Sequence, residues 1–85
     1  MELYTVTFLS CGVASVNMVE ASSPDDANEM FMEKAEADEV LEIRPARAED
    51  IRPGVPLLSR KMDGEIFYSF PSEKALRAML YWASL

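Results

Sequence analysis

The 85-residue sequence contains no histidine and only one cysteine, Cys11. Without histidine the chain lacks the commonest general base and the commonest neutral metal ligand. Because the chain also has only one cysteine, the usual zinc sites, which are built from cysteine and histidine, are excluded. The three glycines, Gly12, Gly54 and Gly64, are scattered, so no glycine-rich phosphate-binding loop is present. We therefore predict a protein that is not an enzyme and that holds no cofactor and no metal.

Long hydrophobic runs and targeting signals are also absent. No stretch approaches the roughly 18–20 apolar residues of a membrane span, and the chain opens without a basic region. One cysteine permits no intrachain disulfide, which is typical of a cytoplasmic protein. The composition, 49% hydrophobic and 27% charged, is ordinary for a folded protein. We expect one cytoplasmic domain over residues 1–85.

Basic residues are few, eight against fifteen acids, and they are unevenly placed. Residues 1–43 carry ten acids and one base, whereas residues 44–85 carry five acids and seven bases. The net charge of −7 argues against direct binding to nucleic acid or to an anionic membrane, since both would repel the chain. It permits a basic protein surface as partner, with simple solubility as the alternative explanation.

Alternating apolar residues predict five strands. Residues 3–9 and 14–21 suit a hairpin whose loop is longer than the two-residue type, and residues 40–44 suit a third strand. Residues 57–61 and 65–70 suit a second hairpin around Asp63-Gly64, which is a strong type I′ turn signal. A loop that contains prolines lies between the third strand and the second hairpin, and it includes a short helical turn at residues 48–51.

Two helices are predicted from their capping residues. Ser23 suits an N-cap and Pro24 the first helical position of a helix over residues 24–37. Ser72 suits the cap of a closing helix that runs to about Ser84. The resulting order, β-β-α-β-loop-β-β-α, predicts an α+β fold in which a small antiparallel sheet lies on one side and both helices pack on the other.

Five acids of the first predicted helix fall within about 100° of its circumference, at the helical period of about 100° per residue. They are Asp25, Asp26, Glu29, Glu33 and Glu36, and Asp38, Glu39 and Glu42 extend the negative patch beyond the helix. Their spacing resembles that of phosphates along a nucleic-acid strand, about 7 Å. This acidic stripe therefore suits mimicry of nucleic acid toward a basic groove. Alternatively, it is a solvated helix face with acids at the positive end of the helix dipole.

The closing helix is apolar around much of its circumference. Leu76, Met79, Leu80 and Ala83 form a seam, and Tyr81, Trp82 and Leu85 add apolar surface beside it. Either this helix is buried on several sides, or Tyr81, Trp82 and Leu85 meet a partner, because Trp and Tyr dominate interface hot spots. The second interpretation permits a homodimer.

The segment YTVTFLSCGVASVNMVEASSPDDANEMF resembles the strand–strand–cap–helix opening of small proteins carried by phages and mobile elements. The resemblance lies in the alternating Tyr4-Val6-Phe8, in Val19-Glu20-Ala21 and in Ser23-Pro24-Asp25-Asp26-Ala27, and the segment covers about a third of the chain. In size, charge and layout the chain is similar to small acidic phage proteins that block host defence nucleases, including anti-CRISPR inhibitors. This resemblance implies a basic surface on a nucleic-acid-binding nuclease complex as the target, in the bacterial host cytoplasm.

Two hypotheses from different classes follow. The first is a small acidic inhibitor that presents its carboxylates to a basic, nucleic-acid-binding surface of a host defence protein. The second is a self-associating accessory module that dimerises through its C-terminal apolar helix.

Overall fold

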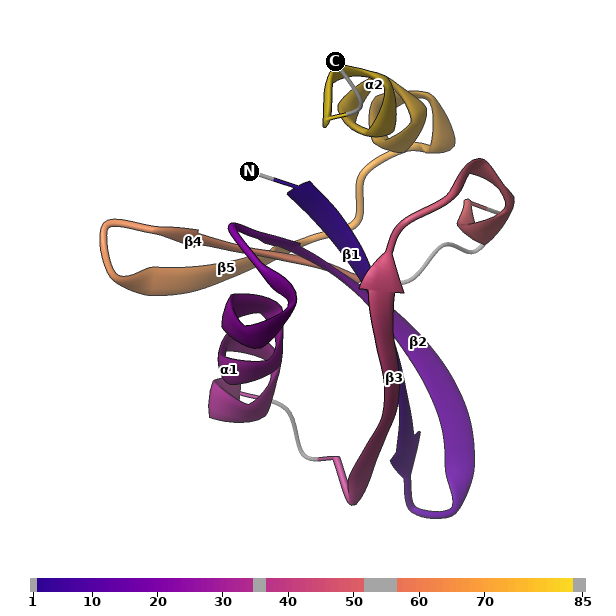
Figure 1. The fold of residues 1–85 in the computed structure, drawn as a ribbon, viewed down its shortest axis with the longest axis vertical. Helices are drawn as coiled ribbons and strands as arrows, with labels where there is room; N and C mark the ends of the chain where they lie inside the picture. The colour runs from indigo at the N-terminus through magenta and orange to yellow at the C-terminus, as the bar shows by residue number, and fades with distance from the viewer. Residues whose placement is uncertain (1, 35–36, 52–56, 84–85) are drawn as a thin grey trace.

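The computed structural model describes residues 2–34, 37–51 and 57–83. Its strands are β1 (Glu2–Ser10), β2 (Val13–Ala21), β3 (Glu39–Pro45), β4 (Leu58–Met62) and β5 (Glu65–Ser69). The helices are α1 (Pro24–Lys34) and α2 (Glu73–Ala83), and a short 3-10 helix, η1 (Ala48–Asp50), follows β3. This order confirms the predicted α+β fold (Figure 1).

The strands form a mixed sheet in the order β3-β1-β2-β4-β5. Three neighbouring pairs are antiparallel, but β2 and β4 run parallel, with Met18 opposite Leu58 and Glu20 opposite Arg60. The prediction of a wholly antiparallel sheet is therefore wrong at this pair. Between the end of β2 and the start of β4 the chain forms α1, β3 and η1. This long connection lets β4 run in the same direction as β2, because parallel neighbours cannot be joined by a tight turn.

The two helices cover opposite faces of the sheet, so the prediction that both lie on one side is wrong. Under α1 the core contains Tyr4, Val6 and Val19, and under α2 it contains Leu3, Met18 and Leu58 around Leu76. The physical reason lies in β1, whose neighbouring residues Leu3 and Tyr4 point to opposite faces and are both buried. Figure 1 shows α2 across one end of the sheet, beside the start of β1 and away from α1.

The turns of the two hairpins are both of the two-residue type. At the second, Asp63 and Gly64 have φ of 51° and 81°, as the predicted type I′ turn requires. At the first, pairing continues to Ser10 opposite Val13, and only Cys11 and Gly12 remain in the turn, with φ of 51° and 77°. The predicted longer loop is therefore wrong, because Cys11 adopts the left-handed conformation that its residue type rarely takes.

Both helices are capped at their N-termini by the predicted serines. The Ser23 Oγ accepts a hydrogen bond from the Asp26 backbone N–H at 3.1 Å, and the Ser72 Oγ accepts one from Ala75 at the same distance. Helix α1 is described over Pro24–Lys34, and Ala37, the predicted last residue, lies outside it. Ala37 packs instead against the hydrophobic core under α1, where the chain turns into β3.

The η1 segment is held against the sheet by one carboxylate. The Asp50 side chain is 5% exposed and accepts hydrogen bonds from Arg44 Nη1 and Nη2 at 2.6 and 2.5 Å. It also accepts from the Thr5 Oγ1 at 3.1 Å and from the Arg47 backbone N–H at 2.8 Å. A charge buried this deeply is stable only when its oxygens are satisfied, as they are here.

Candidate protein-binding site

Helix α1 has one buried side and one acidic side. Ala27, Met30 and Phe31 are at most 3% exposed and pack onto the sheet. Asp25, Glu29 and Glu33 are all exposed, and they follow one another at intervals of four residues. Four residues of helix rise about 6 Å, so these carboxylates form a row along the outer surface. The structure thus places three of the predicted site residues together.

Two other members of the predicted stripe are placed differently. Asp26 is half-buried, and its Oδ2 accepts hydrogen bonds from the backbone N–H and the hydroxyl of Ser22, both at 3.1 Å. It therefore stabilises the start of the helix and offers less charge to a partner. Glu36 lies outside the described residues.

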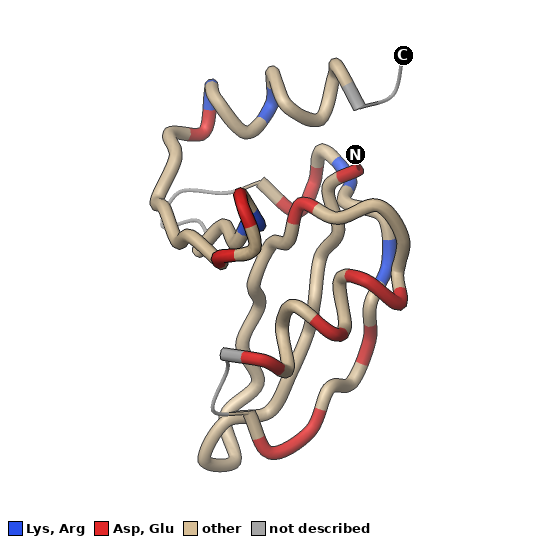
Figure 2. Tube along the Cα trace, turned by 90° about the vertical axis from the view of Figure 1, so that its left-hand side faces the viewer, with Lys and Arg blue, Asp and Glu red and all other residues tan. Residues whose placement is uncertain are grey.

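The acids beyond the helix do not continue the row. The Asp38 Oδ2 accepts a hydrogen bond from the Cys11 backbone N–H at 2.9 Å, which fastens the turn between β1 and β2. Glu39 pairs with Leu9, and the alternation of β1 puts that position on the face opposite α1. Figure 2 shows acidic positions in both α1 and β3, but the register separates Glu39 from the helix row.

The ion pairs of the described residues do not involve the row on α1. Among the described residues, the ion pairs join Arg44 to Glu42 and Asp50, Arg60 to Glu20, and Arg77 to Glu73, and none of these carboxylates belongs to α1. At the far end of the row, burial and the negative charge of Glu33 raise the pKa of the Tyr68 hydroxyl on β5. The charge of the row therefore extends toward β5.

Helix α2 is buried along one side and exposes its last aromatic residues. Leu76 is fully buried, while Met79 and Leu80 are half-buried, so these three members of the predicted seam pack on the sheet. Tyr81 and Trp82 are 60% and 70% exposed, and their rings meet edge to face with centroids 5.7 Å apart. Leu85, the third predicted interface residue, lies outside the described residues.

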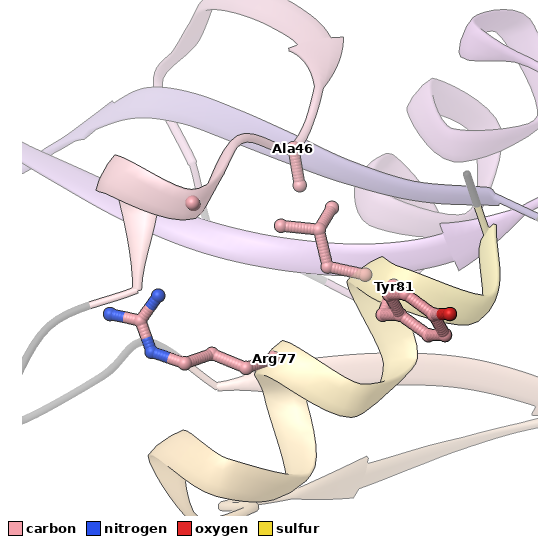
Figure 3. Close-up of a pocket in the computed structure, with 5 residues that line it drawn as sticks. Ala46, Arg77 and Tyr81 are labelled. Atoms are coloured by element: carbon pink, nitrogen blue, oxygen red, sulfur yellow. The ribbon is translucent and has the colours of Figure 1, made fainter.

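A pocket between α2 and the η1 segment was not foreseen from the sequence. It is lined by Ala46, Ala48, Arg77, Leu80 and Tyr81, with a cavity volume of about 420 Å³ (Figure 3). Its described lining offers apolar contact and the guanidinium group of Arg77. The pocket forms from segments far apart in the chain, so no local pattern could have revealed it.

Within the described part of the chain, no group of three or more Cys, Asp or Glu side chains is placed to hold a metal ion. In the same residues, no helix has the length and apolar character needed to cross a membrane. No protein-family model, curated protein or solved structure matches this chain. Its function is therefore inferred from its own residues.

Proposed function

We propose that this protein is a small acidic inhibitor that binds a basic, nucleic-acid-binding surface of another protein, such as a host defence nuclease. The observation that carries the proposal is the row Asp25, Glu29 and Glu33 on the exposed side of α1. Its regular spacing of about 6 Å is close to the spacing of phosphates along a strand. A groove that binds a phosphate backbone would present its cations at a matching interval.

Two features of the row favour binding over simple solubility. First, each of the three carboxylates lies four residues from the next, and like charges at this interval destabilise a helix by a few tenths of a kcal/mol. Second, the ion pairs among the described residues join arginines to acids outside α1, so none of them involves a carboxylate of the row. A cationic partner surface would relieve the repulsion and gain charge-assisted contacts.

The test is capture of a partner on the immobilised full chain, followed by competition. Bacterial lysate is passed over the protein, and the bound fraction is challenged in parallel with single-stranded and double-stranded oligonucleotides and with salt. We expect a nucleic-acid-binding protein that is released by oligonucleotide and by salt raised from about 0.1 to about 0.5 M, where exposed charges are screened. A captured protein that resists both challenges would contradict the proposal.

A second candidate function, self-association through α2, is favoured by the exposure of Tyr81 and Trp82. Large exposed aromatic residues at the end of a helix are typical anchors of protein interfaces. If this function holds, the protein sediments as a dimer at micromolar concentration and the Trp82→Lys variant sediments as a monomer. A wild-type monomer would exclude it.

A further inference from the structure

The sheet has two edge strands, β3 and β5, and they differ in how well they are protected from pairing with another chain. Strand β3 carries the exposed carboxylates of Glu39 and Glu42, contains a bulge opposite Thr7 and Phe8, and ends at Pro45. Charged side chains, bulges and proline are the features that keep an edge from pairing with another chain. Strand β3 is therefore a blocked edge.

Strand β5 lacks each of these features among its last four residues. Residues 66–69 contain no charge and no proline, and the register with β4 shows no bulge. Phe67 and Tyr68 are 47% and 46% exposed, and Phe70, directly after the strand, is 80% exposed. Figure 1 shows the β4–β5 hairpin projecting from the rest of the sheet. An apolar edge of this kind is open to a further strand.

The hairpin register determines which backbone groups face the open edge. Met62 and Glu65 flank a two-residue turn, so they form a hydrogen-bonded pair, and Arg60 and Phe67 form the next such pair. The N–H and C=O groups of Ile66 and Tyr68 then point away from β4. In the described sheet no strand lies beyond β5 to receive them.

We propose that a second copy of this chain occupies the edge, with the two β5 strands antiparallel about a two-fold axis at Phe67. In this register Ile66 of each copy exchanges both backbone hydrogen bonds with Tyr68 of the other, which satisfies every group that β5 points outward. Phe67 lies opposite Phe67 of the second copy, in a non-hydrogen-bonded pair where side chains approach most closely. The two sheets become one continuous sheet.

The choice of a second copy rests on the symmetry of β5. Phe67 is the midpoint of the strand Glu65–Ser69, so the two-fold axis pairs the strand over its whole length. Glu65, the only charged residue of β5, then lies opposite Ser69, so no like charges face each other within the two paired strands. An isologous contact needs such a surface, which is complementary to itself.

Cysteine cross-linking tests this register. In a Cys11→Ser background, which removes the exposed native thiol, Phe67→Cys is compared with Glu65→Cys. The proposed axis brings the Cα atoms at position 67 of the two copies to about 4.5 Å, within disulfide range, and leaves those at position 65 more than about 13 Å apart. We expect oxidised glutathione to convert only the Phe67→Cys protein to a covalent dimer. No dimer, or equal dimer from both variants, would overturn the proposal.

Sedimentation of the uncross-linked protein provides an independent test. Phe67→Lys places two cations opposite each other on the axis, whereas Trp82→Lys introduces the same change on α2. We expect a wild-type dimer, at least a tenfold increase in the dimer dissociation constant for Phe67→Lys, and no increase for Trp82→Lys. Circular dichroism checks that both variants are folded. A wild-type monomer, or dissociation caused by Trp82→Lys alone, would overturn the proposal, and the latter would move the interface to α2.

Discussion

Asp50 is the residue that joins the middle of the chain to the sheet. Its carboxylate is buried and accepts hydrogen bonds from Arg44 on β3 and Thr5 on β1. The backbone N–H of Arg47 adds a further bond. Removing one partner of a buried ion pair leaves the other uncompensated, which costs more than the pair itself contributes.

Replacing Asp50 by Ala is therefore expected to lower the free energy of unfolding by about 2–3 kcal/mol. The measurement is the midpoint of urea denaturation. The matched control is Glu42→Gln, because Glu42 also binds Arg44 but has a side chain that is 58% exposed. We expect the control to change stability by less than about 0.5 kcal/mol. Equal effects of the two substitutions would contradict the assigned role of Asp50.

The same network predicts a dependence of stability on pH. The hydrogen bonds from Arg44 lower the pKa of Asp50 to about 2, from 3.8, and bonds from Arg47 and Thr5 act in the same direction. A carboxyl group with a lowered pKa stabilises the fold above its unfolded pKa, and this contribution is lost as the pH falls from about 4 to about 2. Its size is about 2 kcal/mol.

We therefore expect the stability difference between the wild type and Asp50→Asn to shrink by about 2 kcal/mol between pH 5 and pH 2. Urea denaturation over that range measures it, and the difference removes the contributions of the other carboxyl groups. A difference that stays constant with pH would show that Asp50 is not held ionised by its partners.

For single residues, the sequence predicts contacts between neighbours in the chain and misses contacts between segments that are far apart in the chain. Ser23, Ser72 and the Asp63-Gly64 turn act through neighbours within three residues, so their roles could be predicted from the local pattern. The side-chain partners of Asp50, Thr5 and Arg44, come from β1 and β3, and the carboxylate of Asp38 reaches the turn at Cys11. These contacts depend on the assembled sheet, and no local spacing encodes them.

Among the elements, α1 carries the proposed binding surface and depends on its N-terminal cap. Ser23→Ala removes the side-chain acceptor for the Asp26 N–H and is expected to cost about 1 kcal/mol. Ser72→Ala removes the equivalent bond at α2 and is the matched control. We expect both substitutions to lower the urea midpoint, and only Ser23→Ala to speed hydrogen exchange in residues 24–34. Faster exchange in both helices for either variant would contradict separate caps.

The strands and helices were predicted more reliably than their arrangement. Each predicted element exists, because alternation and capping residues are local signals. The pairing of β2 with β4, and the placement of the helices on opposite faces, arise from how the chain packs as a whole. The acidic stripe illustrates the consequence, since three of its five helical members, Asp25, Glu29 and Glu33, lie in an exposed row, while Glu39 lies across the sheet from them.

At the scale of the whole molecule, the net charge of −7 gives pairing through β5 and binding of a basic partner opposite responses to salt. Two copies of an acidic chain repel each other, and salt screens this repulsion, so pairing through β5 should strengthen as salt rises from about 0.05 to about 0.5 M. Binding of a basic partner should weaken over the same range. Sedimentation and partner capture at matched salt concentrations measure the two trends. If both associations strengthened, or both weakened, as salt rises, the assignment of self-association to β5 and of partner binding to α1 would be contradicted.

The measurement that tests the central claim most directly is the affinity of three forms of the protein for the captured partner. They are the wild type, Glu29→Lys with Glu33→Lys on α1, and Glu49→Lys with Glu73→Lys at exposed positions away from the row and from β5. The two variants have the same net charge, so they differ only in where the charge is reversed. We expect the α1 variant to bind at least tenfold more weakly, a loss of about 1.4 kcal/mol or more, and the control to bind nearly as the wild type does. Equal weakening of both variants would show that only total charge matters and would contradict the account.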